Sequence, residues 1–211
     1  MRRNLVIGYG NLYRKDDGVA FYVVNRLRRR LGQQPLDPDG SGLEELGAQT
    51  DSIFIRQLVP EMLDTARHYG QLIFVDAHTA ANRQPLACIR INPAQGCSPL
   101  THHMGPAAFL VWLKALYEHE PSGYLLTIQG QNFDFHRGLS AAAAGRVEWA
   151  VNIILRLLAH TMALEACKER RPGFMTRGSR SPGDPGVRPV PLPARGGIPL
   201  QEKQRSCDLG Q

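Results

Sequence analysis

Short apolar runs of strand length alternate along this chain with longer stretches in which apolar residues recur every three or four positions. The runs predict five strands, at 4–9, 52–58, 71–77, 86–91 and 124–128. The periodic stretches predict helices at 17–31, 106–118 and 140–164, with a shorter helix whose first turn holds Pro60. This alternation is typical of an α/β fold. We therefore expect three layers, with a mostly parallel, twisted five-stranded sheet and helices on both faces.

Individual positions refine this picture. The run 72–75 is apolar without alternation, which indicates a central strand that is buried on both faces. Ser140 is a good N-cap for the last helix. The core side of the helix at 106–118 is expected to hold Phe109, Leu110, Leu113 and Leu116. Four arginines, at positions 26, 28, 29 and 30, cluster near the end of the first helix. Their positive charges complement the helix dipole there, and we prefer this structural role to ligand binding.

Composition changes abruptly after residue 166. Residues 168–211 hold seven of the fifteen prolines, and nine lysines and arginines against four acids, which leaves sixteen against fifteen in 1–167. We therefore predict an α/β domain over 1–166 and a Pro/Gly/Arg-rich, disordered tail over 167–211. Because the domain itself is nearly neutral, the overall charge of +6 does not indicate a nucleic-acid partner.

Other features narrow the class of protein. The four cysteines include no C-x-x-C pair of the kind that binds zinc or exchanges thiols. The apolar stretch after Arg2 and Arg3 is too short for a signal sequence, and no run approaches the roughly 20 apolar residues that span a bilayer. We expect a cytoplasmic monomer with no membrane partner.

Candidate chemistry lies at the predicted strand ends, because ligands of open parallel sheets bind outside the carboxyl ends of the strands. The first strand leads to Gly8–Asn11 and then to Asp16 and Asp17, the third ends at Asp76 and His78, and residues 101–105 (THHMG) precede a helix. If these three loops open on one edge, two carboxylates and an imidazole can form a divalent-metal site.

Each signal also has another interpretation. Gly8 and Gly10 could open a dinucleotide site, but Tyr13 stands where the G-x-G-x-x-G pattern requires glycine. Asp16 or Asp17 could cap the following helix. Asp76 could be satisfied by backbone donors, although an acid beside a core strand costs stability unless it is paired.

The order of these segments resembles a known family. The segments GYGNLYRKDDGV at 8–19, FVDA at 74–77 and THHMG at 101–105 are similar to the hydrogenase maturation proteases, as are RQLVPEMLD at 56–64 and GQNFDFHRGLS at 130–140. The resemblance covers about residues 4–164.

The resemblance implies an endopeptidase that removes the C-terminal extension from a nickel-loaded [NiFe] hydrogenase large-subunit precursor. It implies that Asp17, Asp76 and His102 contact the nickel, with His103 as the alternative if the register shifts by one. The nickel then belongs to the substrate, and no cofactor is permanently bound. Asp17 and Asp76 are also the candidate catalytic residues, of an aspartic-type peptidase by the family's usual classification.

Other functions stay open at this point. The same residues could serve a non-catalytic nickel metallochaperone or sensor of hydrogenase assembly. A nucleotide-binding oxidoreductase rests on GYGN alone, and a germination-protease-like peptidase is a weaker enzymatic alternative. Neither an H-E-x-x-H helix nor a G-x-S-x-G turn is present in the sequence.

Overall fold

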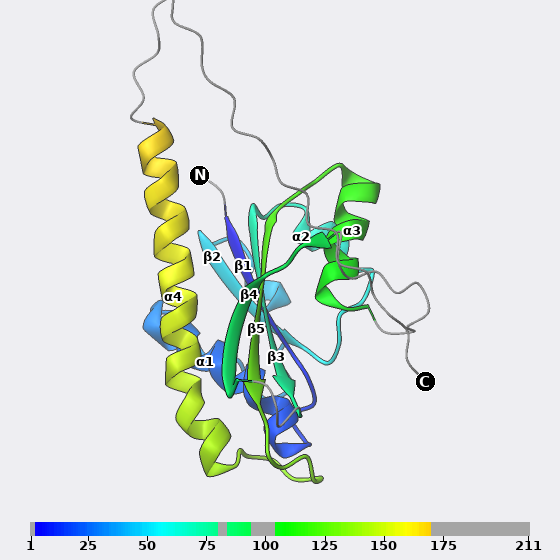
Figure 1. The fold of residues 1–211 in the computed structure, drawn as a ribbon, viewed down its shortest axis with the longest axis vertical. Helices are drawn as coiled ribbons and strands as arrows, with labels where there is room; N and C mark the ends of the chain where they lie inside the picture. Colours follow the sequence, from blue (N-terminus) through cyan, green and yellow to red (C-terminus); the bar gives the residue numbers. More distant parts are fainter. Residues whose placement is uncertain (1–2, 80–83, 94–103, 170–211) are drawn as a thin grey trace, which may run out of the picture. The chain divides into compact units, whose positions relative to one another are not determined.

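A computed structural model describes residues 3–79, 84–93 and 104–169 of the chain (Figure 1). Its five strands form one sheet in the order β2-β1-β3-β5-β4. The strands are β1 (Asn4–Tyr9), β2 (Thr50–Ile55), β3 (Gln71–His78), β4 (Leu86–Arg90) and β5 (Ser122–Gln129). Strands β2, β1, β3 and β5 are parallel to one another, and β4 pairs antiparallel with β5.

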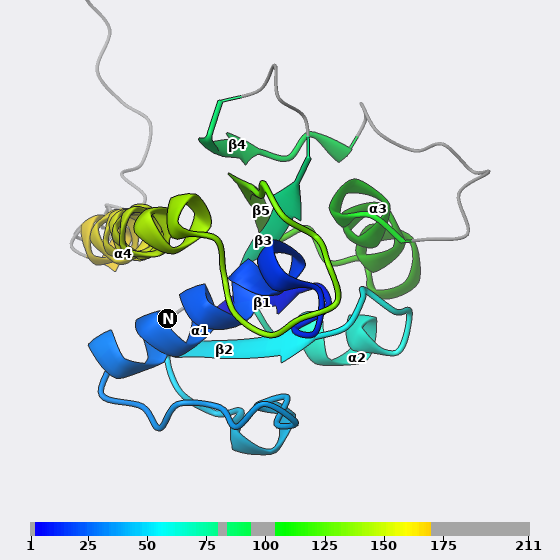
Figure 2. The ribbon, with the colours of Figure 1, turned by 90° about the horizontal axis from the view of Figure 1, so that it is seen from below.

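Helices cover both faces of the sheet, as Figure 2 shows. On one face lie α1 (Val19–Arg30) and α4 (Ala141–Glu169), and on the other lie α2 (Met62–Ala66) and α3 (Pro106–Tyr117). Alternate residues of each strand supply the two cores, so that Val6 packs toward α1 and α4 while Leu5 and Ile7 pack toward α2 and α3. The predicted three-layer α/β fold with a mostly parallel sheet is therefore confirmed.

The strand β3 has the central position that its unbroken apolar run predicts. It lies between β1 and β5, and the side chains of residues 72–75 are fully buried. Its register pairs Val75 with Gly8 of β1 and with Leu126 of β5. A strand of this kind brings its last residues to the same edge as the end of β1.

Several predicted boundaries were wrong by a few residues. Strand β2 covers Thr50–Ile55 and not 52–58, and β5 is longer than 124–128 at both ends. The segment Lys15–Gly18 forms a 3-10 helix, η1, so that α1 begins at Val19. Pro60 lies in the turn before α2 and not in its first turn, since α2 begins at Met62. The amide of Leu63 donates to the Pro60 carbonyl and so links this turn to the helix.

Two predictions about side chains also change. Leu116 of α3 is exposed, because α3 packs on the sheet through Phe109, Leu110 and Leu113 alone among the four predicted positions. Arg28 is buried, and it ties α1 to the connection that leads into β2. Its guanidinium donates to the carbonyl of Ser52 at 3.0 Å and pairs with Glu45. The other three arginines of this cluster are exposed.

The direction of β4 decides which loops share an edge. Because β4 is antiparallel to β5, its carboxyl end lies at the edge where the parallel strands begin. The expectation that the connection after this strand starts at the carboxyl edge was therefore wrong. Helix α3 then leads into the start of β5, so its first turn, after Met104 and Gly105, points back toward the carboxyl edge.

The remaining predictions about the chain's organisation stay predictions. Helix α4 continues to Glu169, beyond the predicted domain boundary at 166, and residues 170–211 of the predicted tail lie outside the described part. Within the described residues, no helix combines the length and apolar character needed to cross a membrane.

Candidate active site at the carboxyl edge of the sheet

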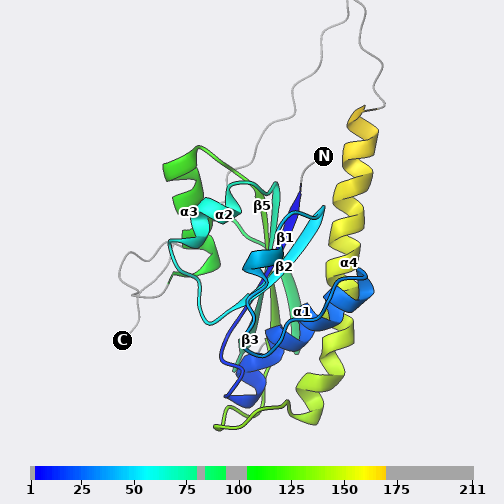
Figure 3. The same cartoon turned by 180° about the vertical axis from the view of Figure 1, so that it is seen from behind.

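Segments that are far apart in sequence meet at the carboxyl edge of β1 and β3. The turn after β1 and the helix η1 lie there together with the loop at 130–140 that joins β5 to α4, as the opposite views in Figures 1 and 3 show. The amide of Gly130 donates to the carbonyl of His78 at 2.9 Å, which places the start of that loop beside the end of β3. Asp17 and Asp76 both belong to this edge.

Asp17 is held by the turn that follows β1. The backbone amide of Asn11 donates to its Oδ2 at 2.9 Å. The turn approaches η1 closely because Gly10 has φ of +141°, and a Cβ at this position would lie 2.1 Å from the Asp17 carbonyl oxygen. Only glycine fits both the backbone angle and the contact. The G-x-G-N pattern thus serves the placement of a carboxylate, which is a different use from the cradling of a phosphate.

Asp76 lies on the last part of β3 and is mostly buried. Burial raises the pKa of its carboxyl to about 6, against hydrogen bonds from Tyr9 and the Ala77 amide that lower it. The pairing of β1 with β3 brings Tyr9 next to Asp76 on the same face of the sheet. Burial and the carboxylate in turn raise the pKa of Tyr9, so its hydroxyl stays protonated and acts as the donor.

The charges of the two aspartates interact. After burial and its hydrogen bonds, the charge of Asp17 contributes to the raised pKa of Asp76. The fold therefore brings together two of the three predicted site residues, from elements about sixty positions apart. Two carboxylates with separate environments, one of them with a pKa near neutrality, are suited to bind a divalent cation or to activate water.

The third predicted ligand belongs to the segment that precedes α3. His102 and its alternative His103 lie outside the described residues, and Met104, the first residue after them, packs against the core on the α2 and α3 face. That face is the one toward which Asp76 points, since it shares the parity of Leu72 and Phe74 on β3. Within the described part of the chain, no three His, Cys, Asp or Glu side chains are grouped to hold a metal.

Asp16 has a structural role that the residue types and their spacing did not reveal, although the resemblance left it out of the ligand set. Its side chain is fully buried and accepts hydrogen bonds from the amides of Gln131, Asn132 and Ser140, at 2.7 to 3.0 Å, and from the Ser140 hydroxyl at 2.7 Å. Burial alone would raise its pKa, but these donors together lower it. Asp16 therefore anchors the loop at 130–140 against η1, and neither aspartate caps α1.

Ser140 links this anchor to the last helix. Its hydroxyl also accepts from the amide of Ala143 at 3.2 Å, and its carbonyl accepts from Ala144. The N-cap predicted for this residue is confirmed, and the same side chain donates to Asp16.

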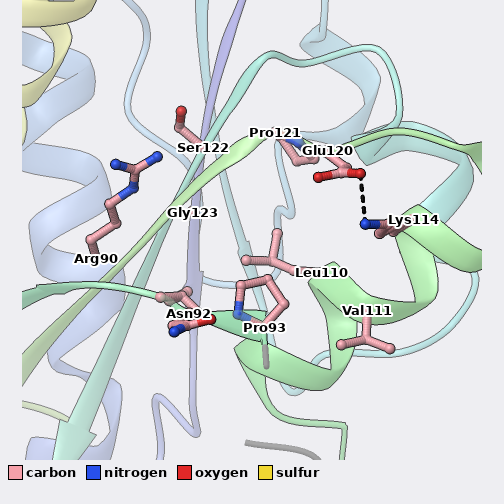
Figure 4. A pocket seen from close by; sticks show the side chains of 11 residues that line it. Arg90, Asn92, Pro93, Leu110, Val111, Lys114, Glu120, Pro121, Ser122 and Gly123 are labelled. Atoms are coloured by element: carbon pink, nitrogen blue, oxygen red, sulfur yellow. Dashed lines mark ion pairs between the residues drawn. The ribbon is translucent and has the colours of Figure 1, made fainter. Parts of the chain in front are cut away.

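Two cavities lie at opposite edges of the sheet. One, of about 400 Å³, is beside the candidate site and is lined by Gly10–Tyr13, by 38–41 and by the end of β2 with Arg56. The other, of about 390 Å³, lies where β5 begins and is lined by β5, α3 and residues 90–93, with the Lys114–Glu120 ion pair at its rim (Figure 4). Neither lining includes Asp17 or Asp76, but the first includes Asn11, whose amide binds the Asp17 carboxylate, so this cavity is the one next to the candidate site.

Comparison with known proteins bears on the fold. No protein-family model matches the sequence, and no curated protein matches it. Among solved structures, the hydrogenase maturating endopeptidase HybD from E. coli aligns over 75% of this chain and 93% of its own, with a TM-score of 0.57 and 20% identity. The chain has the fold of the hydrogenase maturation endopeptidases. A [NiFe] hydrogenase maturation protease HybD from Thermococcus kodakarensis aligns over 74% of this chain and 99% of its own, with a TM-score of 0.54 and 18% identity.

A third solved maturation protease has a similar fold. The [NiFe] hydrogenase maturation protease HycI from Thermococcus kodakarensis KOD1 aligns over 75% of this chain and 93% of its own, with a TM-score of 0.51 and 20% identity. Each alignment includes nearly the whole of the solved protein and about three quarters of this one. The described α/β domain is thus similar to an entire maturation endopeptidase.

Sequence reasoning missed Tyr9, whose hydrogen bond lowers the pKa of Asp76. Tyr9 was read only as the end of a strand, although its parity with Leu5 and Ile7 places it on one face of β1. Its partner on β3 follows from the β1–β3 register, which a single sequence does not contain.

Proposed function

We propose that this chain is an endopeptidase of hydrogenase maturation, which removes the C-terminal extension of a nickel-loaded [NiFe] hydrogenase large-subunit precursor. The proposal rests chiefly on the pair Asp17 and Asp76, two carboxylates that meet at the carboxyl edge of the sheet and interact electrostatically. It is supported by the motifs that carry them and by the fold shared with maturation endopeptidases.

The nickel in this proposal arrives with the substrate. Asp17 and Asp76 supply oxygen ligands and His102 a nitrogen ligand, a set that suits a divalent transition metal. Binding of the ion signals that the precursor has been loaded, and it positions the adjacent peptide bond. Asp17 and Asp76 are also the candidate general bases that accept a proton from the attacking water.

Cleavage of loaded and unloaded precursor tests the metal dependence. Purified protein is incubated with a hydrogenase large-subunit precursor with and without nickel, and the mass of the precursor is followed. We expect loss of a C-terminal peptide from the nickel-loaded form alone. Equal cleavage of both forms would exclude recognition through the metal.

Single substitutions test the residues. Asp17→Asn, Asp76→Asn and His102→Ala should each abolish cleavage of the loaded precursor, whereas His103→Ala should retain it. The reverse result for the two histidines would shift the register of the ligand set by one residue. Nickel-dependent binding of the precursor without any loss of mass would favour the non-catalytic metallochaperone instead.

A further inference from the structure

A surface next to the candidate site combines exposed aromatic rings with basic side chains. We call it the basic aromatic surface and define it as Tyr13, Arg14, Lys15, Phe135 and Arg137. Phe135 is 84% exposed and Tyr13 is 45% exposed, which is unusual for large apolar rings. The surface is formed by the segment directly before Asp17 and by the loop at 130–140.

Two crossed contacts hold its halves together. The guanidinium of Arg14 lies over the ring of Phe135, and that of Arg137 lies over the ring of Tyr13, each 5.5 Å from the ring centre. The amide of Lys15 donates to the carbonyl of His136 at 2.8 Å. Together with the Asp16 anchor, these contacts hold the surface in place before any partner binds, which reduces the ordering cost of binding.

The basic side chains of the surface can still pair with carboxylates of a partner. Within the described part of the chain, none of Arg14, Lys15 and Arg137 forms an ion pair with a carboxylate. Arg14 uses its Nε for the Phe133 carbonyl at 3.3 Å, so that its terminal nitrogens can still donate to a carboxylate. Asp134 is the one acid inside the loop segment 130–140.

The backbone beside the site is strained as well. Lys15 has φ of +43°, a left-handed conformation that is uncommon for a residue with a side chain. Its backbone amide is held by the loop and its neighbours Asp16 and Asp17 are fixed by hydrogen bonds, so the strain is imposed by the surrounding structure.

We propose that the basic aromatic surface is a docking site for an acidic, extended segment of the polypeptide substrate. This proposal rests on the function proposed above and adds to it the means by which the substrate is engaged outside the metal ligands. Carboxylates of the segment pair with Arg14, Lys15 and Arg137, and its apolar side chains cover Phe135 and Tyr13. Tyr13 lines the same cavity as Asn11, whose amide binds the Asp17 carboxylate, so a segment bound here can continue toward the two aspartates.

A single-stranded nucleic acid could also use basic groups and exposed rings. The polypeptide is favoured because its carboxylates can be confined to the part that contacts the three cations. A phosphate backbone carries a charge at every nucleotide and would bring negative charge to Asp17 and Asp76 at the same edge. The near-neutral charge of residues 1–167 supports this choice.

Removal of two positive charges tests the docking site. The variant Arg14→Gln/Arg137→Gln is compared with Arg29→Gln/Arg156→Gln, which removes two exposed positive charges from α1 and α4. Steady-state cleavage of nickel-loaded precursor is measured for both. We expect the first variant to raise KM at least tenfold with kcat within twofold of wild type, and the control to change neither by more than twofold.

Binding of probes gives a readout that does not require cleavage. Fluorescein-labelled ten-residue peptides of glutamate or glutamine, and a ten-nucleotide oligothymidine, are titrated with each protein at 50 and 300 mM salt. We expect the glutamate peptide alone to bind, with an affinity that falls with salt and drops at least tenfold in Arg14→Gln/Arg137→Gln. Phe135→Ala removes the ring that holds the Arg14 guanidinium and should therefore also weaken the complex with the glutamate peptide.

The outcomes separate this proposal from the proposed function. If wild type cleaves the precursor and the two double variants behave alike in both assays, the docking site is wrong while the function stands. If wild type cleaves nothing but binds the glutamate peptide through Arg14 and Arg137, the surface stands and the function is wrong. Tighter binding of the oligonucleotide than of the glutamate peptide would also overturn the docking proposal.

Discussion

Replacement of Asp76 by asparagine should stabilise this protein while it abolishes the proposed cleavage. Asp76 is mostly buried on β3, and its ionised form is disfavoured there first by burial and also by the nearby charge of Asp17. Asparagine has nearly the same shape and can still accept a hydrogen bond from Tyr9 or from the Ala77 amide. The substitution therefore removes an unfavourable charge without opening a cavity.

The size and sign of the effect follow from the two pKa values of the carboxyl group. The folded pKa is about 6 and the ordinary value is 3.8, and each unit corresponds to about 1.4 kcal/mol. The unfolded chain loses its proton first, so unfolding releases a proton between pH values of about 4 and 6 and the free energy of unfolding falls as pH rises through this window. Asparagine does not ionise, so the Asp76→Asn variant does not lose this stability. Its free energy of unfolding should exceed that of wild type by about 1 kcal/mol at pH 4.5 and by at most about 3 kcal/mol at pH 8.

Urea unfolding of wild type and variant at these two pH values measures the gain directly, because other titrating groups cancel in the difference. Asp134→Asn, which changes an exposed carboxyl on the loop at 130–140, is the matched control and should shift the free energy of unfolding by no more than about 0.5 kcal/mol. A variant that is no more stable than wild type at pH 8, or a gain that is the same at both pH values, would refute the reasoning.

Three further predictions concern residues around the site. Tyr9→Phe removes a hydrogen bond that lowers the pKa of Asp76, so the titration of this carboxyl followed by ¹³C NMR should move to higher pH, and an unchanged midpoint would contradict the contact. Asp16→Ala leaves buried donors without their acceptor and should lower the free energy of unfolding by about 3 kcal/mol or more, with early hydrogen exchange in the loop at 130–140; a loss below about 1 kcal/mol would argue against the anchor. Gly10→Ala should cost about 2–4 kcal/mol in urea unfolding because of its positive φ and its contact with η1, whereas Gly145→Ala, with nothing within 4 Å in α4, should stabilise by about 0.5–1 kcal/mol; equal effects would rule out strain at Gly10.

Much of the candidate site could be read from residue types at strand ends. The buried run 72–75 places Asp76 at the end of a central strand, and the pattern from Gly8 to Asp17 places a second acid after the first strand. Parallel strands end at one edge, so the sequence places both acids along that edge. The pairing of β1 with β3 then brings them together. The antiparallel course of β4 lay outside this rule, since a short apolar strand carries no signal of its direction.

The sequence by itself determined the layers, the central strand and the edge at which the two aspartates lie, because these depend on hydrophobic periodicity and on the common direction of neighbouring strands. Residue types alone did not separate Asp16 from Asp17; the resemblance favoured Asp17 as the ligand, and only the tertiary structure revealed the role of Asp16. The two residues are adjacent and chemically identical, and their roles differ because backbone amides more than a hundred positions away surround Asp16 alone. The raised pKa of Asp76 likewise depends on burial and on a tyrosine that the β1–β3 register brings beside it, and such long-range contacts are created only when the chain packs.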